Sequence, residues 1–161
     1  MPPSFKAAMN LLSVQEARER ILQTLHPVGQ TTIPLERAAR HILARDIIAT
    51  IDLPLFDNSA MDGFAIRSSD TSASRVTLRV VADIQAGADL SLGLSRLGPG
   101  EAARIMTGAP LPEGADAVVP MEETDFNDRN AGSPAPSHVI ISRKVNPSEN
   151  VRPRGSDIRL G

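Results

Sequence analysis

Residues 53–66 read LPLFDNSAMDGFAI, a stretch that places two carboxylates, an amide and a hydroxyl between apolar flanks. Asp57, Asn58 and Ser59 carry short polar side chains that bond nearby backbone amides, as in capped turns. The Asp-Gly pair that follows is typical of a turn in which glycine adopts a positive φ. Residue types alone therefore favour a capped turn, with a functional loop as the alternative.

The same stretch closely resembles the D-N-S-A-M-D-G-[YF]-A segment of the molybdopterin molybdotransferase family, which comprises the MoeA proteins and the gephyrin E domain. Two further stretches resemble this family in the same order: RIMTGAPLPEGADAVVPMEET at 104–124 and NVRPRGSDIRLG at 150–161. Three blocks in order are more specific than one motif. The resemblance therefore covers nearly the whole chain, and it is weakest before Val28 and at 125–138.

Composition bounds the class of protein independently of this resemblance. The chain has 161 residues, a mass of 17.2 kDa and 41% hydrophobic residues, which suit one or two small domains with a modest core. The absence of cysteine excludes disulfide scaffolds and thiolate metal sites. His26, His41 and His138 are dispersed and lack the spacing of zinc ligands.

Charge and hydropathy also exclude several partners. A net charge of −2 and four aromatic residues, all Phe, offer neither the basic field nor the stacking surface of a nucleic-acid binder. No run approaches the roughly 18 apolar residues of a membrane span, and the N-terminus lacks the hydrophobic core of a signal peptide. We therefore expect a cytoplasmic protein with no nucleic-acid and no membrane partner.

A helix is predicted to begin at Ser13, because S-V-Q-E at 13–16 forms a capping box, and to end before Pro27. A core-packing face is the interpretation that its pattern favours, and a docking helix is the alternative. The resemblance implies that this helix packs on a large catalytic domain, which 1–161 lacks. The apolar residues of the face recur at helical spacing: Val14, Ala17, Ile21, Leu22 and Leu25.

Beyond the helix the pattern predicts an α+β, β-rich fold. Residues 31–49 read as an extended piece (TTIPL), a helical turn or two (ERAARHI) and a β-leaning run (LARDIIA). A polar hairpin or disordered excursion is expected at 127–137. Apolar residues at alternating positions or in short runs predict strands at Val76–Val81, Ala102–Met106, Ala115–Pro120 and His138–Arg143.

Three parts are predicted from these elements. Residues 1–27 form an N-terminal tail and helix, residues 28–50 plus 146–161 form a small α+β domain, and residues 51–145 form a β-rich domain inserted into it. The resemblance implies a similar arrangement, with the inserted domain a complex fold of coiled and bifurcated β-sheets. In the family a large α/β domain and a β-barrel follow.

The candidate site combines the first two family-like stretches. Thr107 and Gly108 follow an apolar strand candidate, so the hydroxyl should lie at a strand end and the glycine should let a ligand approach the backbone. A plain turn is the alternative. The resemblance to the R-I-x-T-G motif implies that Thr107 and Asp62 lie in the active-site cleft as catalytic residues. Their loops would be supported by Asp57, Asn58, Ser59, Gly63 and Gly108.

The same carboxylates do not form a calcium loop. In an EF-hand that begins at Asp57, the sixth residue would be Asp62 instead of glycine and the twelfth Ser68 instead of glutamate. No phosphate-binding glycine motif occurs in the chain. Solvated charges are the plain interpretation of the basic residues near the end, and a subunit or anion contact is the alternative: Arg143, Lys144, Arg152, Arg154 and Arg159.

The resemblance implies a role in molybdenum cofactor biosynthesis. Family members insert molybdenum from molybdate into adenylylated molybdopterin in a magnesium-dependent reaction. Asp62 would either hold Mg²⁺ or accept a proton when water opens the phosphoanhydride, and both roles stay open. Expected partners are a second copy in a homodimer, other cofactor-biosynthesis enzymes and molybdoenzymes. The alternative function is a non-catalytic dimerisation or scaffold module, and the chain by itself is expected to be inactive.

Overall fold

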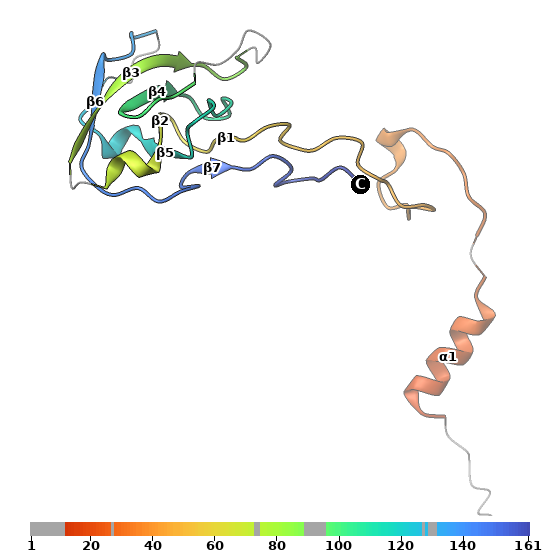
Figure 1. The fold of residues 1–161 in the computed structure, drawn as a ribbon. Helices are drawn as coiled ribbons and strands as arrows, with labels where there is room; N and C mark the ends of the chain where they lie inside the picture. Colours follow the sequence, from red (N-terminus) through yellow and green to blue (C-terminus); the bar gives the residue numbers. More distant parts are fainter. Residues whose placement is uncertain (1–11, 27, 73–74, 89–95, 127, 129–131) are drawn as a thin grey trace, which may run out of the picture. The chain divides into compact units, whose positions relative to one another are not determined.

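A computed structural model of the chain describes residues 12–26, 28–72, 75–88, 96–126, 128 and 132–161 (Figure 1). The chain divides into two compact units, residues 1–46 and residues 47–161. The domain boundaries predicted from the sequence, with 28–50 and 146–161 in one domain, stay a prediction. Four residues of the predicted excursion at 127–137, residues 127 and 129–131, lie outside the described part of the chain.

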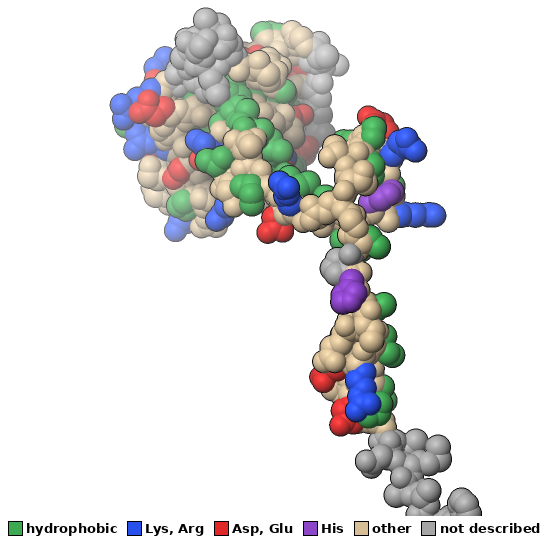
Figure 2. Space-filling view, turned by 90° about the vertical axis from the view of Figure 1, so that its right-hand side faces the viewer, with side chains coloured by type: hydrophobic (Ala, Val, Ile, Leu, Met, Phe, Trp, Pro, Cys, Tyr) green, Lys and Arg blue, Asp and Glu red, His purple; other side chains and the backbone are tan. Residues whose placement is uncertain are grey.

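In its described residues the first unit contains one α-helix, α1, at Val14–Thr24. Its capping box is confirmed: the Ser13 hydroxyl accepts from the Glu16 N–H at 3.2 Å, and the Glu16 carboxylate accepts from the Ser13 N–H at 2.8 Å. None of the helix residues is buried, and Figure 2 shows hydrophobic side chains on its surface. In the described residues, no helix has the length and apolar character that a membrane crossing requires.

The rest of this unit is less regular than the sequence predicts. The expected helical turns are a single 3₁₀ turn, η1, at Leu35–Arg37. The β-leaning run LARDIIA at 43–49, whose last three residues belong to the second unit, forms no strand, so that prediction is wrong. A strand requires a neighbour that satisfies its backbone groups, and no described segment pairs with this run along its length.

The second unit is built on a five-stranded sheet with the order β5-β2-β4-β3-β6. The pairs β2–β4, β2–β5 and β3–β6 are antiparallel, whereas β3 and β4 run parallel. All four strands predicted from the sequence are confirmed. The strands of the sheet are β2 Gly63–Ile66, β3 Val76–Ile84, β4 Glu101–Ile105, β5 Ala117–Pro120 and β6 His138–Ile141.

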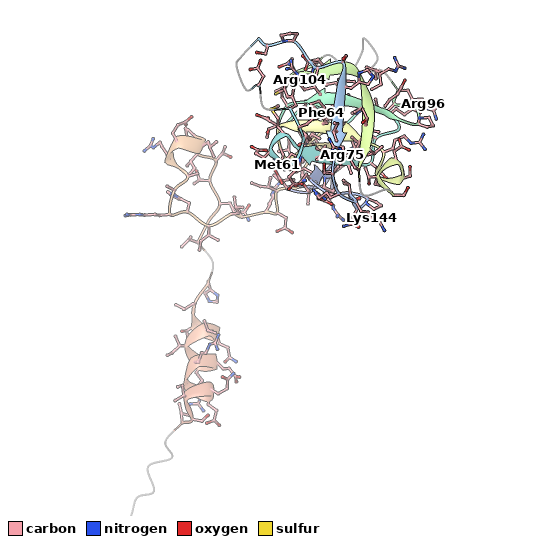
Figure 3. The ribbon with its side chains drawn as sticks, turned by 90° about the vertical axis from the view of Figure 1, so that its left-hand side faces the viewer. Met61, Phe64, Arg75, Arg96, Arg104 and Lys144 are labelled. Atoms are coloured by element: carbon pink, nitrogen blue, oxygen red, sulfur yellow. The ribbon has the colours of Figure 1, made fainter. Side chains whose placement is uncertain are left out.

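The sheet curls into a half-barrel, which confirms the β-rich fold class. Thr124, just after the 3₁₀ turn η4 at Met121–Glu123, bridges to Ile141 of the opposite edge strand. Phe64 lies in the middle of the sheet (Figure 3), and its ring meets Phe126 edge-to-face at 5.9 Å between centroids. A second apolar cluster, which includes Ala65, Ile105 and Val118, covers the other face of the same strands.

A two-stranded arm leads into and out of this sheet, and we call it the arm, residues 49–59 and 151–161. Its strands β1, Asn58–Ser59, and β7, Val151–Arg152, are antiparallel. Further along, Leu53 bridges to Ile158, and the Gly161 N–H donates to the Ala49 carbonyl at 3.0 Å. Figure 1 shows these two segments side by side. The arm therefore fixes the point at which residues 59–62 enter the sheet.

Candidate functional site

Asp62 and Thr107, 45 residues apart in sequence, are hydrogen-bonded to each other. Asp62 immediately precedes β2, and Thr107 follows β4 after one intervening residue. These strands are antiparallel neighbours, with Gly63 opposite Ile105, so the start of one meets the end of the other. Asp62 Oδ1 accepts from the Thr107 backbone N–H and from the Thr107 hydroxyl, both at 2.7 Å.

These two bonds stabilise the ionised form of Asp62. The Thr107 hydroxyl, and then the Thr107 backbone N–H, hold the pKa of the Asp62 carboxyl below its ordinary value. Asp62 is therefore ionised at neutral pH. Its side chain is exposed, and no donor in the described part of the chain reaches its second oxygen, Oδ2. One oxygen is thus fixed by the fold, and the other faces outward.

The loop before Asp62 and the turn after Thr107 are joined through their backbones. The Gly108 N–H donates to the Ser59 carbonyl at 2.8 Å, and the Ser59 N–H donates to the Ala109 carbonyl at 3.0 Å. Ser59 also holds its own loop, because its hydroxyl donates to the Met61 carbonyl at 2.5 Å. Ser59 therefore connects the loop before Asp62 with the turn after Thr107, and its supporting role at a functional site stays a prediction.

Asp57 and Asn58 support the loop from the side of the arm. Asp57 accepts from the Arg154 backbone N–H at 2.7 Å and so connects the incoming and outgoing segments. Asn58 is only 3% exposed and donates from its amide to the Phe56 carbonyl at 3.2 Å. Its Oδ1 is buried without a hydrogen-bond partner in the described residues.

Gly108 and Gly63 have different backbone conformations and surroundings, and Gly63 differs from the prediction. Gly108 has a φ of +80° at the turn, and a Cβ there would meet no atom within 4 Å. Gly63 does not have a positive φ, so the predicted Asp-Gly turn is wrong. It is a residue of β2, and a Cβ on it would lie 2.0 Å from the Val119 carbonyl oxygen. Close approach of the strands therefore requires glycine here.

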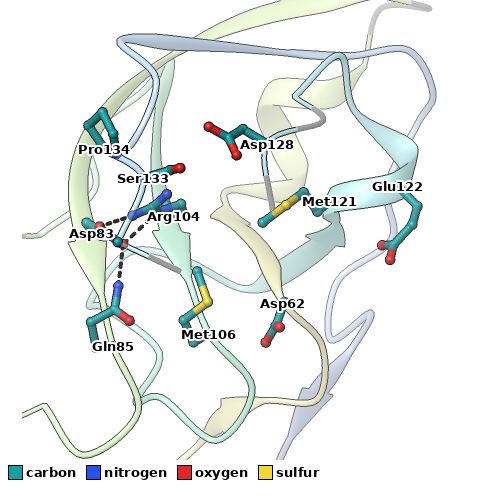
Figure 4. A pocket seen from close by; sticks show the side chains of 11 residues that line it. Asp62, Asp83, Gln85, Arg104, Met106, Met121, Glu122, Asp128, Ser133 and Pro134 are labelled. Carbon is teal, nitrogen blue, oxygen red and sulfur yellow. Dashed lines mark hydrogen bonds and ion pairs between the residues drawn. The ribbon is translucent and has the colours of Figure 1, made fainter. Parts of the chain in front are cut away.

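Asp62 also borders a cavity of about 480 Å³ (Figure 4). Met106 and Met121 contribute apolar wall, and Arg104 of β4 contributes a guanidinium. Asp83 of β3 accepts from Arg104 Nε at 2.8 Å and from Arg104 Nη2. Neither Arg104 nor Asp83 was predicted from the sequence to be a site residue. The available signal was a charged residue inside the otherwise apolar segment 102–105 of strand β4. The Arg104 side chain is buried in the structure.

The charges near the site limit which ions the chain can hold. In the described residues no group of three His, Cys, Asp or Glu side chains could hold a metal ion. A magnesium ion at Asp62 would therefore need most of its ligands from substrate and water, which is common for Mg²⁺. Three arginines of the C-terminal basic set are paired with carboxylates: Arg143 with Glu123 and Glu149, Arg152 with Asp157, and Arg154 with Asp52.

Thr107→Ala is expected to raise the pKa of Asp62 without restoring its ordinary value. The substitution removes the hydroxyl bond but leaves the backbone N–H bond in place, so the loss is about one hydrogen bond, or ~1 kcal/mol. Because the folded pKa lies below the unfolded pKa, the pair stabilises the fold at neutral pH. This contribution disappears as the pH falls through the folded pKa.

The measurement is a carboxyl titration of Asp62 by NMR. Thr107→Ser keeps the hydroxyl and serves as the matched control. An unchanged Asp62 pKa in Thr107→Ala would contradict the assignment of the hydroxyl as its main cause.

Residues 12–161 match the family described as the MoeA N-terminal region, domains I and II. Molybdopterin molybdenumtransferase 2 of Mycobacterium tuberculosis strain H37Rv is 39% identical over 153 residues, which are 92% of this chain and 35% of that protein. The molybdopterin molybdenumtransferase of Staphylococcus aureus strain MSSA476 is 45% identical over 157 residues, 94% of this chain and 35% of that protein.

A solved structure gives the same result. The molybdopterin biosynthesis moeA protein from Pyrococcus horikoshii OT3 superposes with a TM-score of 0.67 and 31% identity over 80% of this chain and 32% of that chain. The chain thus spans about 35% of the length of the curated relatives that it matches.

Proposed function

We propose, from the premise that this chain belongs to the MoeA N-terminal region family, that it forms one wall of a site for molybdenum insertion into molybdopterin. Its relatives are named molybdopterin molybdenumtransferases, and the family belongs to molybdenum cofactor biosynthesis. The observation that carries the proposal for this chain is the Asp62–Thr107 pair, held by the fold at the edge of a cavity. The proposed substrates are molybdate and adenylylated molybdopterin.

The lowered pKa of Asp62 favours one of its two roles. A general base works best when its pKa lies near the operating pH, whereas Asp62 has a pKa below even the ordinary carboxyl value. A permanently ionised carboxylate with one oxygen facing outward is suited to hold a cation. We therefore propose that Asp62 acts as an oxygen ligand and that Thr107 fixes its orientation.

Mg²⁺ fits this arrangement as the cation. Mg²⁺ prefers oxygen ligands and is commonly bound by one or two carboxylates together with substrate phosphates and water. Asp62 Oδ2 would supply the protein ligand, since Oδ1 already accepts two hydrogen bonds. When bound, the ion would neutralise charge on the phosphoanhydride of the substrate.

The chain alone is expected to be inactive. A carboxylate on an open wall lacks the oriented partners and the excluded water that make such groups effective. The test compares this chain with a chimera in which residues 12–161 replace the matching part of the M. tuberculosis relative. Cofactor formation from adenylylated pterin and molybdate is the readout.

We expect activity in the chimera and none in the isolated chain. Turnover by the isolated chain would contradict the proposal that it forms only one wall. A folded chimera without turnover would contradict the proposed function itself.

A dimerisation or scaffold role is the second candidate function. One observation favours it: apolar side chains of the arm lie exposed, including Ile51, Leu55, Ile158 and Leu160, each at least 48% accessible. Exposed apolar surface of this kind commonly marks a contact with another protein. The proposed partners are a second copy of the protein, other cofactor-biosynthesis enzymes and molybdoenzymes, in the cytoplasm. Sedimentation of the chimera before and after Ile51→Ser and Leu160→Ser measures the contribution of the arm to a dimer.

A further inference from the structure

We propose that Asn150 is a positioning residue for Asp62, because its carbonyl and its side-chain amide together tie the loop before Asp62 to the edge of the sheet. The inference rests on the proposed function and deepens it. Asn150 begins the last family-like stretch, residues 150–161, whereas the site described above combines residues of the two earlier stretches. Asn150 acts through the backbone of the loop and not by contact with a substrate.

The first support is a backbone hydrogen bond two residues before Asp62. The Ala60 N–H donates to the Asn150 carbonyl at 2.9 Å. Before this bond the chain is paired in the β1–β7 ladder. After it, the Asp62 carbonyl accepts from the Met121 N–H at 3.0 Å. The three residues from Ala60 to Asp62 are therefore held at both ends, and the direction of the Asp62 side chain depends on both bonds.

The second support is the backbone conformation of Asn150. Its φ is +54°, in the left-handed region, where asparagine is among the few residues other than glycine that occur regularly. The angle φ sets the direction of the carbonyl relative to the preceding residues. The bond to Ala60 therefore depends on this conformation being kept, and a group that holds Asn150 in place also holds Ala60.

The third support is that the Asn150 side chain supplies such a group. Its Nδ2 donates to the Val118 carbonyl at 2.9 Å, and the Val118 N–H donates to the Glu149 carbonyl at 2.9 Å. Val118 is fully buried and belongs to β5, an edge strand of the sheet. A buried carbonyl strongly favours a hydrogen-bond donor. Asn150 is thus fixed to a well-packed part of the sheet.

The strand register connects the same residue of β5 to the other side of Asp62. Strand β2 begins directly after Asp62 and pairs with β5, with Ala65 opposite Val118. The loop before Asp62 and the strand after it are therefore both referred to Val118, the first through Asn150 and the second through the sheet. Loss of the Asn150 amide would release the loop and leave the strand in place.

The test variant is Asn150→Gly, which removes the side-chain amide while glycine adopts a positive φ without strain. Ser148→Gly is the matched control. Ser148 belongs to the same turn, has a φ of +64° and is exposed, and its hydroxyl has no hydrogen-bond partner in the described residues. Both variants introduce glycine at a left-handed position, so they differ only in the side chain that is lost.

The first readout is NMR of this chain. In the wild type the Ala60 amide should exchange slowly with solvent. Asn150→Gly should speed this exchange about tenfold, the effect of about one lost hydrogen bond. It should also shift the Thr107 amide signal, because that N–H donates to Asp62. Ser148→Gly should leave both amides as in the wild type.

The second readout is the Mg²⁺ requirement of cofactor formation by the chimera. Groups that orient a metal ligand typically change metal affinity tenfold or more when they are removed. We therefore expect Asn150→Gly to raise the Mg²⁺ concentration for half-maximal activity about tenfold, and Ser148→Gly to leave it unchanged. A purely structural role would lower the urea midpoint of Asn150→Gly and move neither the Thr107 signal nor the Mg²⁺ requirement.

The proposal is overturned if the Ala60 amide of the wild-type chain exchanges rapidly, a result that needs no variant to fold. It is also overturned if Asn150→Gly leaves the Thr107 signal in its wild-type position. Both results leave cofactor formation by the wild-type chimera unaffected. Conversely, a shifted Thr107 signal together with a wild-type chimera that forms no cofactor would contradict the proposed function but not the positioning of the Asp62 loop by Asn150.

Discussion

Gly63→Ala should destabilise the unit of residues 47–161 by about 3 kcal/mol or more. The added Cβ would lie 2.0 Å from the Val119 carbonyl oxygen and 2.9 Å from the Val119 carbonyl carbon. Both atoms belong to the backbone of β5, which pairs with β2, so no side-chain rotation can relieve the contact. The edge strand β5 would have to separate from its neighbour β2. For a protein of this size such a loss is a large fraction of the total stability.

Urea unfolding followed by circular dichroism measures this loss. Gly98→Ala is the matched control, because the nearest atom to its Cβ would be Glu101 Oε2, the end of a flexible side chain, at 3.3 Å. We expect the control to unfold at nearly the wild-type urea concentration. A Gly63→Ala protein with an unchanged midpoint would show that β2 and β5 are further apart in solution than described here.

Asp62→Asn should lower cofactor formation by the chimera about 100-fold or more while the fold is retained. The asparagine amide has the size of the carboxylate, and its oxygen can still accept from Thr107, so the loop should keep its conformation. The negative charge that would hold a cation is lost. The measurement is the initial rate of molybdenum insertion, with thermal unfolding as the check on folding.

Asp116→Asn offers a closely matched control for this experiment. Asp116 also accepts from one residue through a backbone N–H and a hydroxyl, those of Ser68, at 2.6 Å and 2.7 Å. It borders a different hollow, formed with Arg67 and Arg96. We expect near wild-type activity from this variant. Equal losses in both variants would mean that Asp62 acts through general loop stability and not through its charge.

Local patterns in the sequence were sufficient to predict several secondary-structure elements. The capping box at Ser13 predicted the start of α1, because its two hydrogen bonds involve residues only three positions apart. Strand β3 was predicted from alternation, since residues such as Thr77 and Arg79 face solvent while Leu78 is buried. One face of β3 is exposed to solvent, and the alternation of polar and apolar residues in the sequence reflects this exposure.

Strand β2 was missed for the opposite reason. All four of its residues are buried, so GFAI shows no alternation, and the Asp62–Gly63 pair at its start indicated a turn. The Asp62–Thr107 contact is similarly invisible to local patterns, because it depends on the register of β2 and β4. Only the resemblance to the family paired these residues beforehand. The Arg104–Asp83 pair depends on the parallel register of β3 and β4 and was not anticipated at all.

The arm has a mechanical consequence for the second unit. Its two chain ends are paired, from Ala49 with Gly161 to Ser59 with Val151. A force that pulls these ends apart would therefore break the hydrogen bonds of the arm one after another, starting with the bond between Gly161 and Ala49. The curled sheet and the Asp62 loop would bear load only after the last of these pairs had opened. Opening of the arm can thus protect the conformation of the Asp62 loop when the two ends of the unit are pulled apart.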